Sequence, residues 1–285
     1  MVWIKAVIWL LLSNLLLTGG MVLTIYLAAE ILSACCAISL AAMFLVYLAL
    51  AIFCFGLFSA LLSWLLMSHV VKRLLVLQPL AATGREAFAR KTAGNLAQRL
   101  GMREPQLYSF ADAGPNALVL GLGRQRAWML LSSGLLQSSS DAELRAVIAH
   151  EMAHIYSGDM LTMQLLQGTT IVFGFALAQL LATLFHSQQP ARALFIFVLQ
   201  ALFFLFALLP IAWFSRRREY AADRFAAEQY GVAGMLSLLR KRAAVTGHDA
   251  CCGPLASLAT FGETRGVFAS HPVAEQRIAA LQKLA

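Results

Sequence analysis

The chain alternates between long runs without charge and segments rich in charged side chains. Residues 6–29 carry no charge, and about 24 helical residues are enough to cross a hydrocarbon core of about 30 Å. Residues 31–71 carry none either, which is too long for one span, so a turn near 33–36 followed by a long helix fits best. We therefore expect two transmembrane helices within residues 1–71, at about 6–29 and 38–67.

A second pair of apolar runs lies after the charged middle of the chain. Residues 160–185 and 193–214 are free of charged side chains, and the segment between them contains Pro190. This pattern predicts a transmembrane hairpin over 160–214, and Pro210 is expected to kink its second arm.

Two segments, residues 72–159 and 215–285, have the charged and polar composition of water-exposed chain. In the first, apolar residues at helical spacing predict a helix over about 81–100 that stops at Gly101. Short apolar runs separated by Gly-Pro and Gly-Arg pairs then predict the strands of a small sheet, at 106–110, 117–122 and 127–131. The second segment is expected to be mostly helical.

Composition and charge agree with a membrane protein. Hydrophobic residues make up 60% of the 285 positions and charged residues only 13%, whereas about a quarter of residues are charged in an ordinary soluble domain. The net charge of +8 comes from basic residues that bracket the apolar runs, so we do not expect nucleic-acid binding. By the positive-inside rule, both termini and both polar segments are expected in the cytoplasm.

A leader sequence is a weaker alternative at the N-terminus. Lys5 followed by an apolar run resembles a signal peptide, and Leu32 to Cys35 resembles a lipobox. The run is longer than the apolar core of a typical signal peptide, and Glu30 lies between it and the lipobox, so we expect the segment to be retained as a membrane span.

The sequence from Ser140 to His154 contains an H-E-x-x-H motif on a predicted helix. Ser140 and Glu143 fit a capping box, and no Gly or Pro interrupts the following residues. His150 and His154 would lie one turn apart on the same face and could hold one metal ion. Glu151 would lie beside that metal, where a general base is expected. The alternative is a solvated helical face without a metal.

A catalytic zinc needs a third protein ligand. Glu219 is the best candidate, because in Glu219-Tyr220-Ala221-Ala222-Asp223 a helix would offer Glu219 to the metal and Asp223 to the back nitrogen of a ligand histidine. Asp159 is too close to His154 along the chain to be an easy choice. Pairing of Glu219 with a nearby arginine is the alternative.

These motifs resemble those of the HtpX family of membrane metalloproteases, which is related to the CAAX prenyl proteases. The resemblance rests on the H-E-x-x-H helix, Gly158-Asp159, the run 215–223, Ser270-His271-Pro272 and Arg277-Ile278, and it covers nearly the whole chain. It implies one Zn²⁺ per chain and a site of eight residues. The implied roles are zinc ligation by His150, His154 and Glu219, general base by Glu151, hydrogen bonding to a ligand by Asp223, substrate binding by Asn116, and contacts near the substrate carbonyl by His271 and Arg277.

Three of these residues have simpler alternatives. Asn116 could be a turn residue after Pro115, Arg277 a surface helix charge, and His271 a residue at a helix start. The family also usually continues Asn-Ala-Phe-Ala-Thr-Gly where this chain has Asn116-Ala117-Leu118-Val119-Leu120-Gly121. This departure concerns the contacts of the strand with substrate and leaves the metal site unchanged.

The expected fold class is mainly α and integral to the membrane, with four transmembrane helices and a cytoplasmic zincin-like metallopeptidase domain that contains a small β-sheet. The domain would combine residues 72–159 with residues 215–285. The resemblance implies a zinc-dependent endopeptidase of the bacterial inner membrane that cleaves misfolded or damaged membrane proteins under stress. Prenyl-protein processing and a zinc-binding scaffold without catalysis are the alternatives; a transporter is disfavoured because the spans hold no internal charge.

Overall fold

The structure of the protein is a computed structural model. It describes residues 76–121, 124–160, 189–244 and 272–284, and the single residues 54, 58, 62, 162, 163 and 166. Contacts divide the chain into two compact units, one made of 1–63 with 164–207 and the other of 64–163 with 208–285. The second unit contains the motifs of interest.

The predicted membrane spans at 6–29, 38–67 and 160–185 fall almost entirely outside the described residues. Within the described part of the chain, no helix combines the length and the apolar character needed to cross a membrane. The fourth predicted span, 193–214, lies within a longer helix that is given below.

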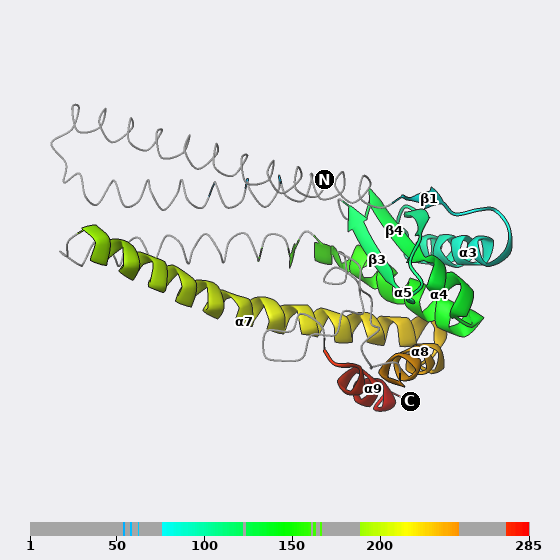
Figure 1. The fold of residues 1–285 in the computed structure, drawn as a ribbon. Coiled ribbons are helices and arrows are strands. Elements are labelled where there is room, and N and C mark those ends of the chain that lie inside the picture. The colour runs from blue at the N-terminus through cyan, green and yellow to red at the C-terminus, as the bar shows by residue number, and fades with distance from the viewer. Residues whose placement is uncertain are drawn as a thin grey trace. The chain divides into compact units, whose positions relative to one another are not determined.

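A small mixed sheet is present where the sequence predicts one. Its strands are β1 (Gln78–Pro79), β2 (Gln106–Phe110), β3 (Ala117–Gly121) and β4 (Ala127–Ser132). Their order is β1-β2-β4-β3, with β2 and β4 parallel and the other two pairs antiparallel. β3 and β4 form a hairpin, and because β4 lies between β2 and β3, β3 forms one edge of the sheet (Figure 1).

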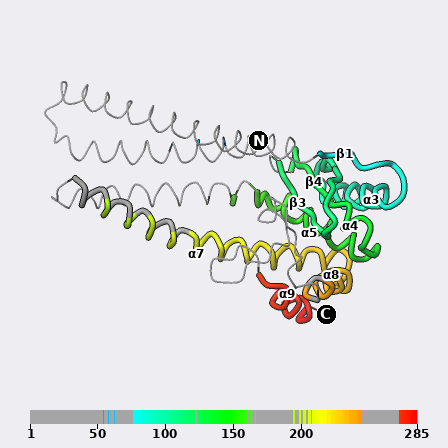
Figure 2. Tube along the Cα trace, viewed as in Figure 1, coloured from blue at the N-terminus to red at the C-terminus, as the bar shows by residue number. Residues whose placement is uncertain are grey.

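Helices make up most of the rest of the described chain. They are α3 (Gly84–Arg99), α4 (Ser133–Ser138), α5 (Asp141–Ser157), α7 (Gln189–Tyr230), α8 (Ala233–Ala244) and α9 (Ala274–Gln282). The predicted hairpin leaves residues 186–192 as the turn between its arms. This prediction is wrong at the end of the turn, because α7 already begins at Gln189 and has Pro190 in its first turn, where proline is tolerated. The same helix contains Pro210 and continues past Phe214 to Tyr230, where the chain turns into α8 (Figure 2).

The main core lies between one face of the sheet and helices α3, α5 and α8. Met129 contributes to it from β4, Val147 from α5 and Leu239 from α8. Helix α8 approaches α5 closely, since a Cβ on Gly234 would lie 2.3 Å from the carbonyl oxygen of Ala142. This close packing holds α5, the helix that carries the H-E-x-x-H motif, firmly against α8.

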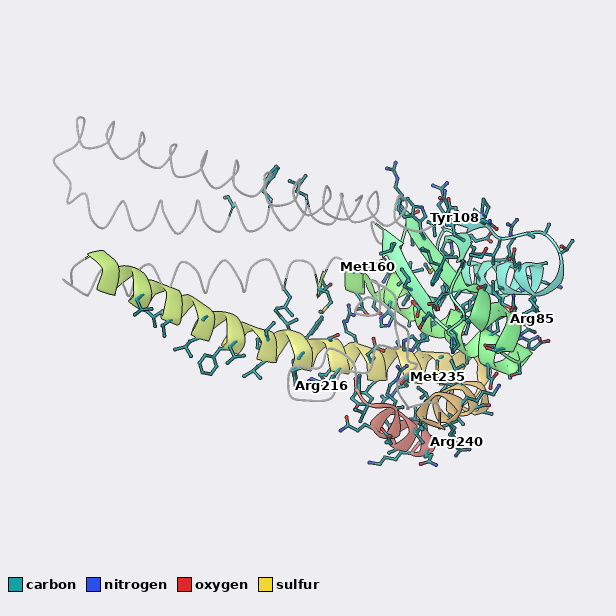
Figure 3. The ribbon with its side chains drawn as sticks, viewed as in Figure 1. Arg85, Tyr108, Met160, Arg216, Met235 and Arg240 are labelled. Atoms are coloured by element: carbon teal, nitrogen blue, oxygen red, sulfur yellow. The ribbon has the colours of Figure 1, made fainter. Side chains whose placement is uncertain are left out.

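Arg85, labelled in Figure 3, ties α3 to the chain just before α5. Its Nε donates to the carbonyl of Leu136 at 3.2 Å, and its guanidinium also contacts the carbonyl of Ser139 and the carboxylate of Asp141. These contacts hold the segment that leads from α4 into α5.

The capping box predicted at the start of α5 is confirmed. The Ser140 hydroxyl accepts from the Glu143 backbone N–H at 3.3 Å, and Glu143 Oε2 accepts from the Ser140 backbone N–H at 2.7 Å. Glu143 is buried and also accepts from Ser237 (2.6 Å) and Lys241 (2.8 Å) of α8. One carboxylate therefore caps α5 and joins it to α8.

We expect Glu143→Ala to destabilise the second unit by about 2 kcal/mol, because it removes a helix cap and leaves Ser237 without its acceptor. The apparent melting temperature of the full chain in detergent should fall by roughly 4 to 8 °C. Glu228→Ala, which removes an exposed carboxylate of α7, is the control and should change it little.

The effect of Glu143→Ala should depend on pH. Burial opposes ionisation of Glu143, but hydrogen bonds from Lys241, Ser237 and Ser140 outweigh it and lower its pKa from 4.5 to about 2. A lowered pKa means that the ionised carboxylate stabilises the fold above its unfolded pKa and that this stabilisation is lost as the pH falls from about 4.5 towards 2. The difference in melting temperature between the unaltered protein and Glu143→Ala should therefore shrink as the pH falls through this range. A difference that stays constant would contradict the stabilising role of the ionised Glu143 carboxylate.

Candidate metal centre

Helix α5 places the three polar residues of the H-E-x-x-H motif in the interior. His150, Glu151 and His154 have exposed fractions of 0%, 1% and 6%, which excludes the solvated helical face. The Nε2 atoms of the two histidines lie 3.3 Å apart, and the rings meet edge to face. The two imidazoles are thus aimed at a common point.

Glu219 of α7 reaches the same point. Its Oε2 lies 3.5 Å from His150 Nε2, and its Oε1 lies 3.5 Å from His154 Nε2. Two ligands at about 2.05 Å from a metal in tetrahedral geometry lie about 3.4 Å from each other. The three donors therefore have the separations of ligands that share one small metal ion.

The outer nitrogen of each histidine contacts a carboxylate. His150 Nδ1 lies 2.9 Å from Asp223 Oδ1, and His154 Nδ1 lies 2.8 Å from Asp159 Oδ2. Each Nδ1 then carries the proton, which leaves the lone pair of a neutral ring on Nε2. Lone pairs of two rings and a carboxylate at one point repel each other unless a cation lies between them, so the donor set fits a metal.

The charges around the site favour the same conclusion. Burial alone would lower the pKa of both histidines, but the carboxylates next to them outweigh it: Asp223 and Glu219 raise the pKa of His150, and Asp159 and Glu219 raise that of His154 to about 9. The site contains four carboxylates and two guanidiniums, those of Glu151, Asp159, Glu219, Asp223, Arg218 and Arg277. The raised pKa values mean that the carboxylates favour positive charge at the two rings. When the rings are neutral, as metal ligands must be, four carboxylates and two guanidiniums leave two negative charges, which one divalent cation balances.

Arg277 of α9 lies behind the ligands and not on the surface. It is 2% exposed, and its Nε and Nη2 donate to the two oxygens of Asp223 at 2.8 and 2.7 Å. Its Nη1 lies 3.4 Å from Glu219 Oε2. The surface-charge alternative is therefore wrong, while the position of Arg277 near a substrate carbonyl stays a prediction.

Asp159 has a structural role that the sequence reasoning missed. Gly158 ends α5 with a left-handed φ of 71°, and this turn brings Asp159 back towards His154. Arg218 of α7 donates from Nη1 to the Asp159 carbonyl at 2.8 Å and so joins this turn to the helix that carries Glu219. The sequence feature that could have revealed this role is Gly158 followed by the acidic Asp159, directly after the helix that carries the H-E-x-x-H motif.

We expect Asp159→Asn to weaken metal binding by about 10- to 100-fold, because the neutral amide no longer fixes and polarises the His154 ring. Competition between the protein and a chromophoric chelator for added Zn²⁺ measures this change. Glu275→Gln, which removes an exposed carboxylate of α9, should leave the affinity unchanged. Equal affinity of Asp159→Asn and the unaltered protein would show that Asp159 does not support the ligand.

Asn116 and His271 are the two remaining predicted site residues. Asn116 directly precedes the edge strand β3 and is buried; its amide donates to Asp112 Oδ2 at 2.6 Å, and its carbonyl accepts from the Ser132 N–H at 2.9 Å. These contacts give it a role in the turn before β3, while its contact with substrate stays a prediction. His271 lies outside the described residues.

Comparison with known proteins identifies the family to which this site belongs. The sequence profile of peptidase family M48 matches residues 85–285, a range that includes every metal-site residue described above. The chain belongs to peptidase family M48. It is therefore a metallopeptidase, and the M48 profile covers the motif helix, Glu219 and Arg277 alike.

Similar M48 proteins are named HtpX proteases. A protease HtpX homolog from Bordetella petrii is 35% identical over 220 residues, which cover 73% of this chain and 75% of that protein. Protease HtpX from Stenotrophomonas maltophilia is 34% identical over 247 residues, which cover 81% and 84%. The predicted resemblance to the HtpX family is thus confirmed.

A solved structure supports the fold. The structure of S. mikatae Ste24p matches with a TM-score of 0.59 over 98% of this chain, at 18% sequence identity. This chain spans 65% of the length of Ste24p. The similarity shows that the two proteins share a fold.

Proposed function

We propose that this M48 peptidase is a membrane-bound zinc endopeptidase that cleaves misfolded or damaged polypeptides, membrane proteins above all. The observation that carries the proposal is the convergence of His150, His154 and Glu219 next to the buried carboxylate of Glu151. Three protein ligands are typical of catalytic zinc, whereas structural zinc usually has four. The names of the HtpX relatives support proteolysis.

His150, His154 and Glu219 would hold the zinc, which when bound polarises a water molecule and the scissile carbonyl. Glu151 takes the proton from the attacking water and passes it to the leaving amine. Glu151 is buried, and its charge acts on both His154 and Arg277, so its carboxylate lies close to the metal-site residues.

The remaining residues have supporting roles in this proposal. Asp223 and Asp159 fix the ring orientation and tautomer of the two ligand histidines. Arg277 positions Asp223 and Glu219 and balances their charge. His271, Arg277 and Asn116 are proposed to contact substrate, His271 and Arg277 near the carbonyl and Asn116 at the start of β3.

The proposed location is the bacterial inner membrane, with both termini and the active site in the cytoplasm. The charge-free runs of the sequence and the basic residues that bracket them support this topology. Only Gly158 and Asp159 lie between the end of α5 at Ser157 and the apolar run that begins at Met160. If this run enters the membrane, the metal site lies close to the lipid headgroups, a position that suits substrates that are in the membrane or leaving it.

The test is cleavage by the purified, zinc-loaded full chain of two substrates, unfolded casein and a prenylated peptide. Cleavage of casein is expected. Cleavage of the prenylated peptide alone would instead favour prenyl-protein processing. Stoichiometric zinc without cleavage of either substrate would favour a non-catalytic scaffold.

A further inference from the structure

A pocket that no metal-site residue lines lies on the outer side of α3. Its volume is about 540 Å³, and it is bordered by α3, by the first half of α5 and by the last residue of α7. The side chains that matter for its chemistry are Phe88, Lys91, Asn95, Arg99, Arg145 and Tyr230. Its size is within the range of about 300 to 1,000 Å³ that small-molecule sites occupy.

One wall of the pocket is the outward face of α3. Phe88, Lys91, Asn95 and Arg99 recur at spacings of three and four residues and so form one stripe of the helix. The opposite stripe, which includes Ala89, is buried in the core. The pocket wall is therefore held by a helix that is fixed from behind.

The pocket is strongly basic. Lys91, Arg99 and Arg145 all line it, and none of its lining side chains is acidic. Among the described residues, no carboxylate lies within ion-pair distance of any of the three. Other basic side chains of this unit, such as Lys241 and Arg277, do pair with carboxylates.

Aromatic rings hold the two guanidiniums in the pocket. Arg145 lies over the Phe88 ring at 5.2 Å, and Arg99 lies over the Tyr230 ring at 5.4 Å and donates from Nη2 to its hydroxyl at 3.2 Å. Stacking restricts a flexible arginine and leaves its planar N–H groups available to an anion. Less entropy is then lost when a ligand binds.

We propose that this pocket binds a ligand through its phosphate groups. Planar guanidiniums match the oxygens of a phosphate in bidentate geometry, and Lys91 adds a mobile point charge. The amide of Asn95 is available to a neighbouring polar group of the ligand. The phosphate can belong to a soluble compound or to the headgroup of an anionic lipid, and the experiment below distinguishes these sources.

The test is isothermal titration of the purified full chain in a non-ionic detergent, first with inorganic pyrophosphate and then with the soluble short-chain lipid dihexanoyl phosphatidylglycerol. Whichever of the two probes the unaltered protein binds, the double variant Arg99→Gln/Arg145→Gln should bind it at least about tenfold more weakly, because each guanidinium contributes charged hydrogen bonds. Asn95→Phe fills the pocket and keeps all three charges, and it should also abolish binding.

The matched control is Arg103→Gln, which removes an exposed charge that lies outside the pocket and should leave binding unchanged. Binding of pyrophosphate supports a soluble phosphate ligand, and binding of the lipid alone supports a headgroup. Casein cleavage and the melting temperature should be unaltered in all three variants, which shows that they fold. Failure of both probes to bind, or equal weakening in Arg103→Gln, or full binding by Asn95→Phe, would overturn the proposal.

Discussion

Replacing Glu151 by Gln is expected to abolish peptide cleavage and to leave the metal in place. The amide is nearly the same size as the carboxylate and so preserves the packing around this buried position, but it cannot accept a proton from water. The loss of general-base catalysis alone predicts a fall in turnover of about 10² to 10⁴-fold. Casein cleavage and zinc content, measured on the same preparation, report the two properties separately.

Glu228→Gln provides the control for this experiment, because it makes the same chemical change on an exposed position of α7. It should retain both cleavage and zinc. Normal cleavage by Glu151→Gln would show that another group accepts the proton. Loss of both zinc and cleavage in Glu151→Gln would show that Glu151 is needed to form the metal site and not specifically to accept the proton.

Arg277→Gln should be the most destabilising substitution in this unit. It leaves the carboxylate of Asp223 buried without its bidentate partner and removes a positive charge next to Glu219. Removing one member of a buried ion pair costs about 3 to 5 kcal/mol. The apparent melting temperature of the full chain in detergent should fall by roughly 10 °C or more.

A second substitution identifies the cause of this loss. In Arg277→Gln/Asp223→Asn no unpaired charge is left between the two side chains, so the double variant should recover part of the stability. Arg224→Gln, on an exposed position of α7, should be close to the unaltered protein. A double variant that is less stable than Arg277→Gln would contradict the role of charge pairing between Arg277 and Asp223.

Local sequence patterns were sufficient for strands β2, β3 and β4 and for the start of the motif helix, but not for the short strand β1. The strands depend on short apolar runs bounded by glycine and proline, and the start of α5 depends on a capping box that Ser140 and Glu143 complete within one turn. The convergence of His150 and His154 follows from helical spacing alone. These features need no information on tertiary contacts.

Long-range contacts explain what the sequence did not predict. Arg277 and Asp223 are 54 positions apart, and nothing in the pattern around Arg277 distinguishes a buried counter-charge from a surface charge. Asp159 needs the left-handed turn at Gly158 to reach His154. The pocket between α3, α5 and α7 likewise combines side chains that only the fold brings together.

We propose above all that Glu219 completes, from α7, a metal site whose other two ligands are on α5. The most direct measurement is the zinc content of the purified full chain compared with that of Glu219→Gln, determined by mass spectrometry of the metal after exhaustive dialysis. We expect about one zinc per chain in the unaltered protein, since His150, His154 and Glu219 form a single site, and a large loss of zinc in the variant. Equal zinc content in the two proteins would contradict it.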